Sequence, residues 1–211
     1  MKPIIENKEQ LFIADLQRDI KVCGLPLKDP GTTRLKAQGA HDPTPTPYFV
    51  LEELFEGIEF TPQSHLLDVG CGTGRVLAFH KSARIPGRAT GIELDPDLAK
   101  CAQEWTRRYA TIGAKQGDAL DLPLGDFTHF YLFNPFDTNV LLKFLACIEA
   151  QVNHAVRLIH MSDNGETYFY MGRPGWTLVR QGEFHKYRNA RGRAFAVYEH
   201  PQHYSIWRYE P

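Results

Sequence analysis

Residues 66–75 read Leu-Leu-Asp-Val-Gly-Cys-Gly-Thr-Gly-Arg, and this stretch decides the fold. Its apolar start is typical of a buried parallel strand, and its three glycines predict a tight turn into a helix. Glycines in such a turn can adopt positive φ, and they leave no side chain between the backbone N–H groups and a ligand. Asp68, at the end of the strand, can accept hydrogen bonds from a polar or cationic ligand. The stretch therefore predicts a cofactor-binding loop.

The glycine spacing indicates which cofactor the loop fits. A dinucleotide loop follows G-x-G-x-x-G and seats the pyrophosphate on the helix N-terminus. Gly70, Gly72 and Gly74 instead follow G-x-G-x-G, and Arg75 occupies the place of the third glycine. No G-x-x-x-x-G-K-[ST] phosphate loop occurs in the chain. The spacing therefore disfavours a standard dinucleotide loop, and the missing phosphate loop disfavours a nucleoside triphosphate site of that type. A purely structural turn, or a variant dinucleotide loop, is the alternative to a loop for another cofactor.

A second acid stands at the end of the next expected strand. Residues 89–93, Ala-Thr-Gly-Ile-Glu, predict a short buried strand, and Leu94, Asp95 and Pro96 predict the start of a helix. Ligands of open α/β sheets lie beyond the carboxyl ends of the strands, where Glu93 can hold a ribose diol. Nicotinamide enzymes use such an acid too, so Glu93 alone does not distinguish the cofactors.

With Asp68 two residues before the first glycine, the loop resembles motif I of the class I S-adenosylmethionine-dependent methyltransferases. Two later features fit the same family. Gln116-Gly117-Asp118-Ala119 resembles its adenine-reading segment, and the apolar run 127–133 leads into Asn134-Pro135-Phe136 at the motif IV position. The four features span about a third of the chain.

The resemblance implies a role for each matching residue. Backbone groups of the glycine loop are expected beside the methionine part of the cofactor, and the Asp68 carboxylate beside its ammonium. Asp118 is expected to face the adenine amine, and the Ala119 N–H a ring nitrogen. The predicted cofactor-binding residues are Asp68, Gly70, Cys71, Gly72, Gly74, Glu93, Leu94, Asp118, Ala119 and Asn134.

The catalytic residues expected at motif IV are Asn134, Phe136 and Asp137. Methyl transfer requires donor and nucleophile in line, and for many acceptors the removal of a proton. The Asn134 amide can orient an amine or hydroxyl, and the Phe136 ring can pack against the acceptor. The candidate bases are Asp137, His41 and Tyr48, although transfer to an amine needs no dedicated base.

Residues 24–47 are irregular and rich in proline and glycine. Their last part combines stiff prolines with polar side chains directly before an expected helix, 49–57. We interpret it as a lid over the cofactor, with His41, Asp42, Thr44 and Tyr48 as acceptor or lid residues. A surface connection that the prolines merely stiffen is the alternative. We predict an N-terminal helix and lid segment at 1–47 and a methyltransferase domain at 48–211.

The fold class follows from the alternation of elements. We predict an α/β, doubly wound, mostly parallel seven-stranded sheet with an antiparallel C-terminal hairpin, flanked by helices. The hairpin is expected from the runs 176–186 and 194–200, with 204–209 as an edge segment. An amphipathic N-terminal helix is expected at 8–21. Its apolar residues, near helical spacing, are Leu11, Phe12, Leu16 and Ile20.

Composition limits the partners. The chain has 211 residues and a formal net charge of −1, which gives no broad attraction for nucleic acid or an anionic membrane. Neither a transmembrane run nor a signal-peptide centre occurs, so we expect a cytoplasmic protein. The four cysteines lack C-x-x-C pairing, and the histidines lack ligand spacing, so no metal site and no disulfide framework is expected.

The expected function is methyl transfer from S-adenosylmethionine to an amine or hydroxyl of a small molecule or protein. The motif Asn134-Pro135-Phe136-Asp137 has one proline fewer than enzymes that methylate exocyclic base amines, which disfavours a nucleic-acid acceptor. The chain also resembles protein-lysine methyltransferases in its Gly-x-Gly-Arg and Glu-Leu-Asp-Pro features, so lysine is the alternative acceptor. A catalytically silent S-adenosylmethionine-binding protein is the alternative of another class, and a NAD-dependent oxidoreductase is disfavoured. The sequence does not fix the oligomeric state.

Overall fold

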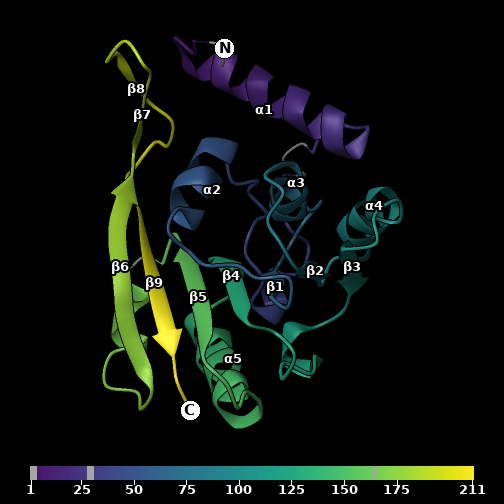
Figure 1. Ribbon diagram of the computed structural model, residues 1–211, viewed down its shortest axis with the longest axis vertical. Coiled ribbons are helices and arrows are strands. Elements are labelled where there is room, and N and C mark those ends of the chain that lie inside the picture. Colours follow the sequence, from purple (N-terminus) through teal and green to yellow (C-terminus); the bar gives the residue numbers. More distant parts are fainter. Residues whose placement is uncertain (1–3, 28–30, 164) are drawn as a thin grey trace.

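The computed structural model describes residues 4–27, 31–163 and 165–211. A seven-stranded sheet runs through the molecule in the order β3-β2-β1-β4-β5-β9-β6 (Figure 1). Its strands are β1 (His65–Val69), β2 (Arg88–Glu93), β3 (Ile112–Gln116), β4 (His129–Phe133), β5 (Val156–Met161), β6 (Trp176–Phe184) and β9 (Gln202–Tyr209). The first five pair in parallel, and β9 pairs antiparallel with both β5 and β6. The predicted doubly wound sheet is confirmed.

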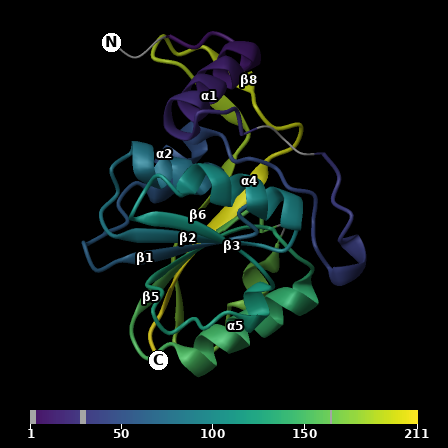
Figure 2. The ribbon, with the colours of Figure 1, turned by 90° about the vertical axis from the view of Figure 1, so that its right-hand side faces the viewer.

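Helices cover both faces of this sheet, which buries the apolar parallel strands from two sides. Helices α2 and α4 lie on one face and α5 on the other (Figure 2). The helices are α1 (Lys8–Cys23), α2 (Tyr48–Phe55), α3 (Arg75–Ser82), α4 (Pro96–Thr106) and α5 (Thr138–Gln151). Two apolar clusters result: one packs α2 and α3 on the sheet, and the other packs α5 on its opposite face. No helix in the described part of the chain is both long enough and apolar enough to cross a membrane.

The C-terminal strands differ from the sequence prediction. Strand β6 pairs with β9, not with the run at 194–200, and β9 lies inside the sheet while β6 forms its edge. The expected second hairpin strand instead forms β8 (Ala194–Ala196), which pairs with β7 (Lys186–Arg188) in a separate two-stranded ribbon. The physical reason is burial: residues 204–207 of β9 are all buried, which suits an interior strand, whereas β8 is mostly exposed.

The buried face of helix α1 differs in part from the predicted one. Leu11 is buried and Leu16 half-buried as expected, but Phe12 and Ile20 are exposed, and Asp15 and Asp19 are buried instead. The reason is Arg75 at the start of α3, which is buried and donates hydrogen bonds to both carboxylates. Arg75 is therefore a buried anchor for α1 and not a surface residue.

The expected lid segment lies along the loop that follows β4. It contains the short 3₁₀ helix Lys36–Gln38, while residues 28–30 fall outside the described part. Ala40 forms an isolated antiparallel bridge with Phe136. The N–H of His41 donates to the Pro135 carbonyl, and the N–H of Asp137 donates to the Gly39 carbonyl. These backbone bonds hold the lid segment over the carboxyl ends of the parallel strands. The boundary at residue 47 stays a prediction.

Candidate cofactor and acceptor site

The glycine loop turns sharply at the end of β1. The N–H groups of Gly70 and Cys71 both donate to the Ile92 carbonyl, which ties the loop to the end of β2. Gly70 has a φ of 70°, and a Cβ there would lie 2.8 Å from Pro135 Cβ. The turn thus requires glycine both for its backbone conformation and for the close approach of the β4 loop.

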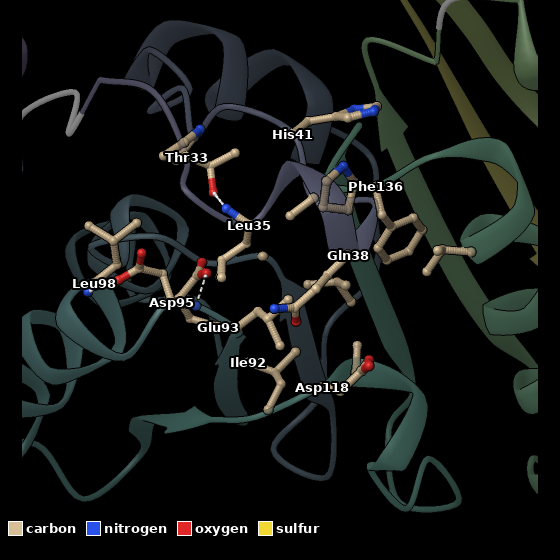
Figure 3. Close-up of a pocket in the computed structure, with 18 of the residues that line it drawn as sticks. Thr33, Leu35, Gln38, His41, Ile92, Glu93, Asp95, Leu98, Asp118 and Phe136 are labelled. Atoms are coloured by element: carbon tan, nitrogen blue, oxygen red, sulfur yellow. Dashed lines mark hydrogen bonds between the residues drawn. The ribbon is translucent and has the colours of Figure 1, made fainter.

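A cavity of about 300 Å³ opens beside this loop, within the size range of small-molecule sites. It lies at the carboxyl ends of the strands, with the lid segment above it (Figure 3). The predicted cofactor residues that line it are Gly70, Glu93, Leu94, Asp118 and Ala119. The predicted lid residues that line it are His41, Asp42 and Thr44. The structure therefore brings most of the predicted nucleoside contacts and lid residues to one cavity.

Glu93 is buried at the floor of this cavity. Its Oε2 accepts the N–H of Gly72 at 2.7 Å, and its Oε1 accepts the N–H of Asp95 at 2.9 Å. Burial raises the pKa of the carboxyl, and the backbone donors partly oppose that rise. Glu93 thus orders the glycine loop, and one wall of the cavity with it. Its predicted contact with a ribose stays a prediction.

Asp68 lies beneath the loop rather than on the cavity wall. Its side chain is almost completely buried, and Oδ2 has no hydrogen-bond partner among the described residues. Burial raises the pKa of this carboxyl well above its ordinary value, and the Glu93 carboxylate adds to the rise. A buried, unpaired carboxyl oxygen costs free energy unless a donor satisfies it. The predicted ammonium of the cofactor is a donor of the right charge.

The other loop residues have less access to a ligand. Cys71 and Gly72 line only a small hollow of about 40 Å³ beneath Pro43–Pro45. Gly74 lines no cavity; it packs against Trp105, whose Cζ2 would lie 2.9 Å from a Cβ at that position. The loop therefore borders the first cavity at Gly70 and not at Cys71, Gly72 or Gly74, and the predicted contact with the methionine part stays a prediction.

A second cavity, of about 260 Å³, adjoins the first on the far side of the lid segment. The two share Asp42, Thr44 and Phe133 in their walls. Asn134 and Ser162, which follow β4 and β5, both line the second cavity with positive φ, 39° and 58°. Such strain is maintained by the surrounding structure and clusters at functional sites.

Two further side chains complete the second cavity. Tyr198 lines it with a hydroxyl that is buried and meets no hydrogen-bond partner within the part of the chain that the structure describes. Gln202 accepts a hydrogen bond from Ser162 Oγ at 2.6 Å. Burial raises the pKa of the Tyr198 phenol, so the group is neutral and available as a donor. We call this second hollow the Asn134 cavity.

Three predicted catalytic or acceptor residues lie elsewhere. Phe136 lines the first cavity and packs on Phe144, so it stands on the cofactor side and not beside the Asn134 cavity. Asp137 lies outside both cavities and is bound to His41 Nε2 at 3.0 Å. The placement of Tyr48 at the acceptor was wrong, because its side chain is buried under α1 and donates to Asp19 at 2.8 Å.

Sequence reasoning missed several lining residues. The lid residues Leu35 and Gln38 project into the first cavity, and Thr33 stands beside them (Figure 3). The glycine after Lys36–Gln38, with its left-handed φ of 79°, was a usable signal for an ordered turn there. The sequence did not indicate Tyr198 and Gln202 as site residues. Their position beside the cavity depends on the order of the C-terminal strands in the sheet, which the sequence pattern did not predict. Within the described ranges, no group of three or more His, Cys, Asp or Glu side chains could hold a metal ion.

Comparisons with known proteins agree with this geometry. A family model described as "Methyltransferase domain" matches residues 66–154. Demethylmenaquinone methyltransferase from Staphylococcus carnosus is 30% identical over 76 residues, which is 36% of this chain and 32% of that protein. The match therefore spans about a third of the length of that curated relative.

Solved structures show the same fold at low identity. An RNA methyltransferase from Salinibacter ruber in complex with S-adenosyl-L-homocysteine superposes with a TM-score of 0.54 at 20% identity, covering 79% of this chain and 92% of that one. A putative methyltransferase from Escherichia coli superposes with a TM-score of 0.59 at 15% identity, covering 89% and 92%. Together with the strand order, these superpositions show that the chain has the class I methyltransferase fold, and residues 66–154 match a methyltransferase domain.

Proposed function

We propose that this protein transfers the methyl group of S-adenosylmethionine to an amine or hydroxyl of a small molecule seated in the Asn134 cavity. The observation that carries the proposal is the shared wall: Asp42, Thr44 and Phe133 line both this cavity and the one beside the glycine loop. A donor in one cavity and an acceptor in the other would meet across that wall, as an in-line displacement requires.

The donor side of the proposal uses residues already predicted from the sequence. Glu93 and Asp118 would hold the nucleoside at the first cavity, and Asp68 would accept from the ammonium beneath the loop. When bound, S-adenosylmethionine supplies a methyl group activated by a sulfonium leaving group. The residues of the chain then contribute position and exclusion of water, which are the main requirements of such a transfer.

The acceptor side fits a small polar molecule. The cavity offers the Asn134 amide and the unpartnered Tyr198 hydroxyl, beside the Phe133 ring. These groups can orient a hydroxyl or amine while an aromatic face packs its carbon skeleton. A volume of about 260 Å³, recessed behind the lid, favours a small molecule over a nucleic acid.

None of the three candidate bases faces the acceptor with a free group. His41 donates from Nδ1 to the Asn134 carbonyl at 2.8 Å, and its Nε2 lies 3.0 Å from the Asp137 carboxylate. Both ring nitrogens of His41 thus contact oxygens of the chain itself. We therefore assign His41 and Asp137 to fixing the lid, and we favour an amine acceptor, which needs no dedicated base. The Asp42 carboxylate in the wall accepts from the Thr33 N–H and pairs with Lys36, and it could accept a further hydrogen bond from the neutral amine while the nitrogen lone pair faces the methyl group.

A protein-lysine acceptor is the second candidate because the same carboxylate would attract a lysine side chain. A labelled-methyl assay distinguishes the two. Cell extract is separated into a small-molecule and a protein fraction, and each is incubated with the protein and labelled S-adenosylmethionine. We expect label in the small-molecule fraction, and label confined to protein would favour lysine.

Cofactor binding is tested separately by thermal shift. S-adenosylhomocysteine at about 100 times its Kd should stabilise the protein by about 2.7 kcal/mol, whereas NAD should give no shift. Glu93→Ala should reduce the stabilisation, and the matched control Glu104→Gln, at an exposed residue of α4 that does not line the first cavity, should leave it unchanged. Stabilisation by NAD alone would contradict the proposal.

A further inference from the structure

A third hollow, of about 660 Å³, lies at the amino ends of β4 and β5, the edge of the sheet opposite the glycine loop. It is bounded by the segment 56–59 that follows α2, and by residues of β6 and β9. It shares no lining residue with the two cavities of the candidate site. We call it the arginine groove, because Arg157, Arg180 and Arg208 all line it.

Two of these arginines face one another across neighbouring strands. Arg157 of β5 is the direct antiparallel partner of Arg208 of β9, so both side chains leave the same face of the sheet. Like charges in directly opposed positions destabilise a sheet. Arg157 Nη1 is buried and has no hydrogen-bond partner among the described residues. The pair is thus costly as it stands, and an anion between the two guanidinium groups would remove that cost.

The third arginine adds a fixed positive charge. The Arg180 guanidinium donates to the carbonyls of Glu53, Leu54 and Glu56 at the end of α2. These backbone bonds hold it in place without neutralising its charge.

The acidic side chains near the groove are exposed, and none of them is bound to Arg157 in the described part of the chain. Glu56 and Glu59 line the groove, but both are exposed. Glu210 pairs with Arg208 and is not part of the lining. With Glu210 included, three guanidinium groups stand against three exposed carboxylates, but the buried Nη1 donor of Arg157 meets no acceptor among the described residues.

We propose that the arginine groove is a second ligand site, which binds the phosphate or carboxylate group of a small molecule between Arg157 and Arg208. Guanidinium groups bind both kinds of oxyanion through paired, charge-assisted hydrogen bonds. Ile58 and Val179, also in the lining, provide an apolar surface for the rest of such a molecule. Because the groove is separate from the glycine loop, this site is independent of the proposed methyl transfer.

The test measures binding of three probes to the full chain by calorimetry: inorganic phosphate, a nucleoside monophosphate and hexanoate, each at constant ionic strength. Saturating S-adenosylhomocysteine is present throughout, so that binding at the glycine loop does not contribute. We expect at least one probe to bind, with an affinity reduced about tenfold or more in Arg157→Gln, because one charge-assisted pair is lost. Tighter binding of the phosphates, or of hexanoate, decides which oxyanion the groove prefers.

Two controls keep the test decisive. Arg107→Gln removes an exposed arginine outside the groove and should leave the affinity unchanged. Without any probe, Arg157→Gln should be at least as stable to urea as the native chain, because it removes a repulsion and no bond. The proposal is overturned if no probe binds the native protein at millimolar concentration, or if Arg157→Gln and Arg208→Gln both bind as tightly as the native chain.

Discussion

Arg75 Nη2, at the first residue of α3, lies 2.8 Å from Asp19 Oδ2 of α1, and both side chains are buried. Arg75 also donates to Asp15 at 3.3 Å and to the Leu27 carbonyl at 2.7 Å. The residue that ends the glycine motif therefore anchors the N-terminal helix. A displacement of α1 would therefore shift Arg75 and the turn that precedes α3.

Replacing Arg75 by glutamine should destabilise the protein strongly. The variant leaves Asp15 and Asp19 buried without their cation, and breaking a buried ion pair costs about 3–5 kcal/mol. Urea unfolding measures the difference. The control is Arg191→Gln, which breaks an exposed pair with Glu6 and should cost no more than about 1 kcal/mol. Equal losses in the two variants would show that the buried network does not stabilise the fold.

Asp15 should make stability depend on pH. Burial raises its pKa from 3.8 to about 6, and the Arg75 charge opposes that rise only in part. The folded chain therefore holds this proton more tightly than the unfolded chain, so the free energy of unfolding falls as pH rises from about 4 to about 6. The fall due to this group is on the order of 3 kcal/mol. Asp15→Asn should remove that part of the slope, and an unchanged slope would place the titration elsewhere.

The buried face of α1 could not be predicted from its apolar spacing. Hydrophobic periodicity favoured Phe12 and Ile20, which are exposed, because the pattern treats Asp15 and Asp19 as surface residues. Their burial depends on Arg75, which is distant in sequence. The glycine loop, by contrast, could be predicted, because the glycine pattern that makes its turn is contiguous in the sequence, even though Ile92 and Glu93 also hold it in place.

Gly70→Ala should damage both fold and cofactor binding. The new Cβ would lie 2.8 Å from Pro135 Cβ, on a residue held at a φ of 70°, and such strain costs about 1–3 kcal/mol. Gly113→Ala is the matched control, since nothing lies within 4 Å of its Cβ position and its φ is not left-handed. Unfolding and S-adenosylhomocysteine titrations should show losses only for Gly70→Ala. Wild-type affinity in that variant would mean that the loop does not need this tight turn.

Binding of the cofactor should release a proton from Asp68. Burial first, and the nearby Glu93 carboxylate second, raise the pKa of Asp68 well above its ordinary value, which favours the protonated carboxyl in the free protein. An incoming ammonium favours the ionised form and lowers that pKa. Calorimetry of S-adenosylhomocysteine in two buffers of different ionisation enthalpy should therefore report proton release near neutral pH. Asp68→Asn should abolish the release, and identical heats in both buffers for the native chain would contradict the assignment.

The acceptor side was less predictable than the cofactor side. Asn134 was identified from its place after β4, since the strand and its motif are continuous in sequence. Ser162, Tyr198 and Gln202 reach the same cavity from β5, a loop and β9. Their convergence depends on β9 lying inside the sheet, and the sequence pattern placed that strand at the edge.

Tyr198→Phe should separate stability from activity. The native hydroxyl is buried without a partner, so its removal costs no hydrogen bond and should leave stability unchanged or raise it by up to about 1–3 kcal/mol. If that hydroxyl orients the acceptor, the same variant should show a higher KM for the acceptor, with cofactor affinity unaltered. Tyr187→Phe, in the exterior ribbon, is the control and should change neither quantity. A Tyr198→Phe enzyme with native KM would remove this hydroxyl from the acceptor site, whereas a large loss of stability would show that it has a partner in solution.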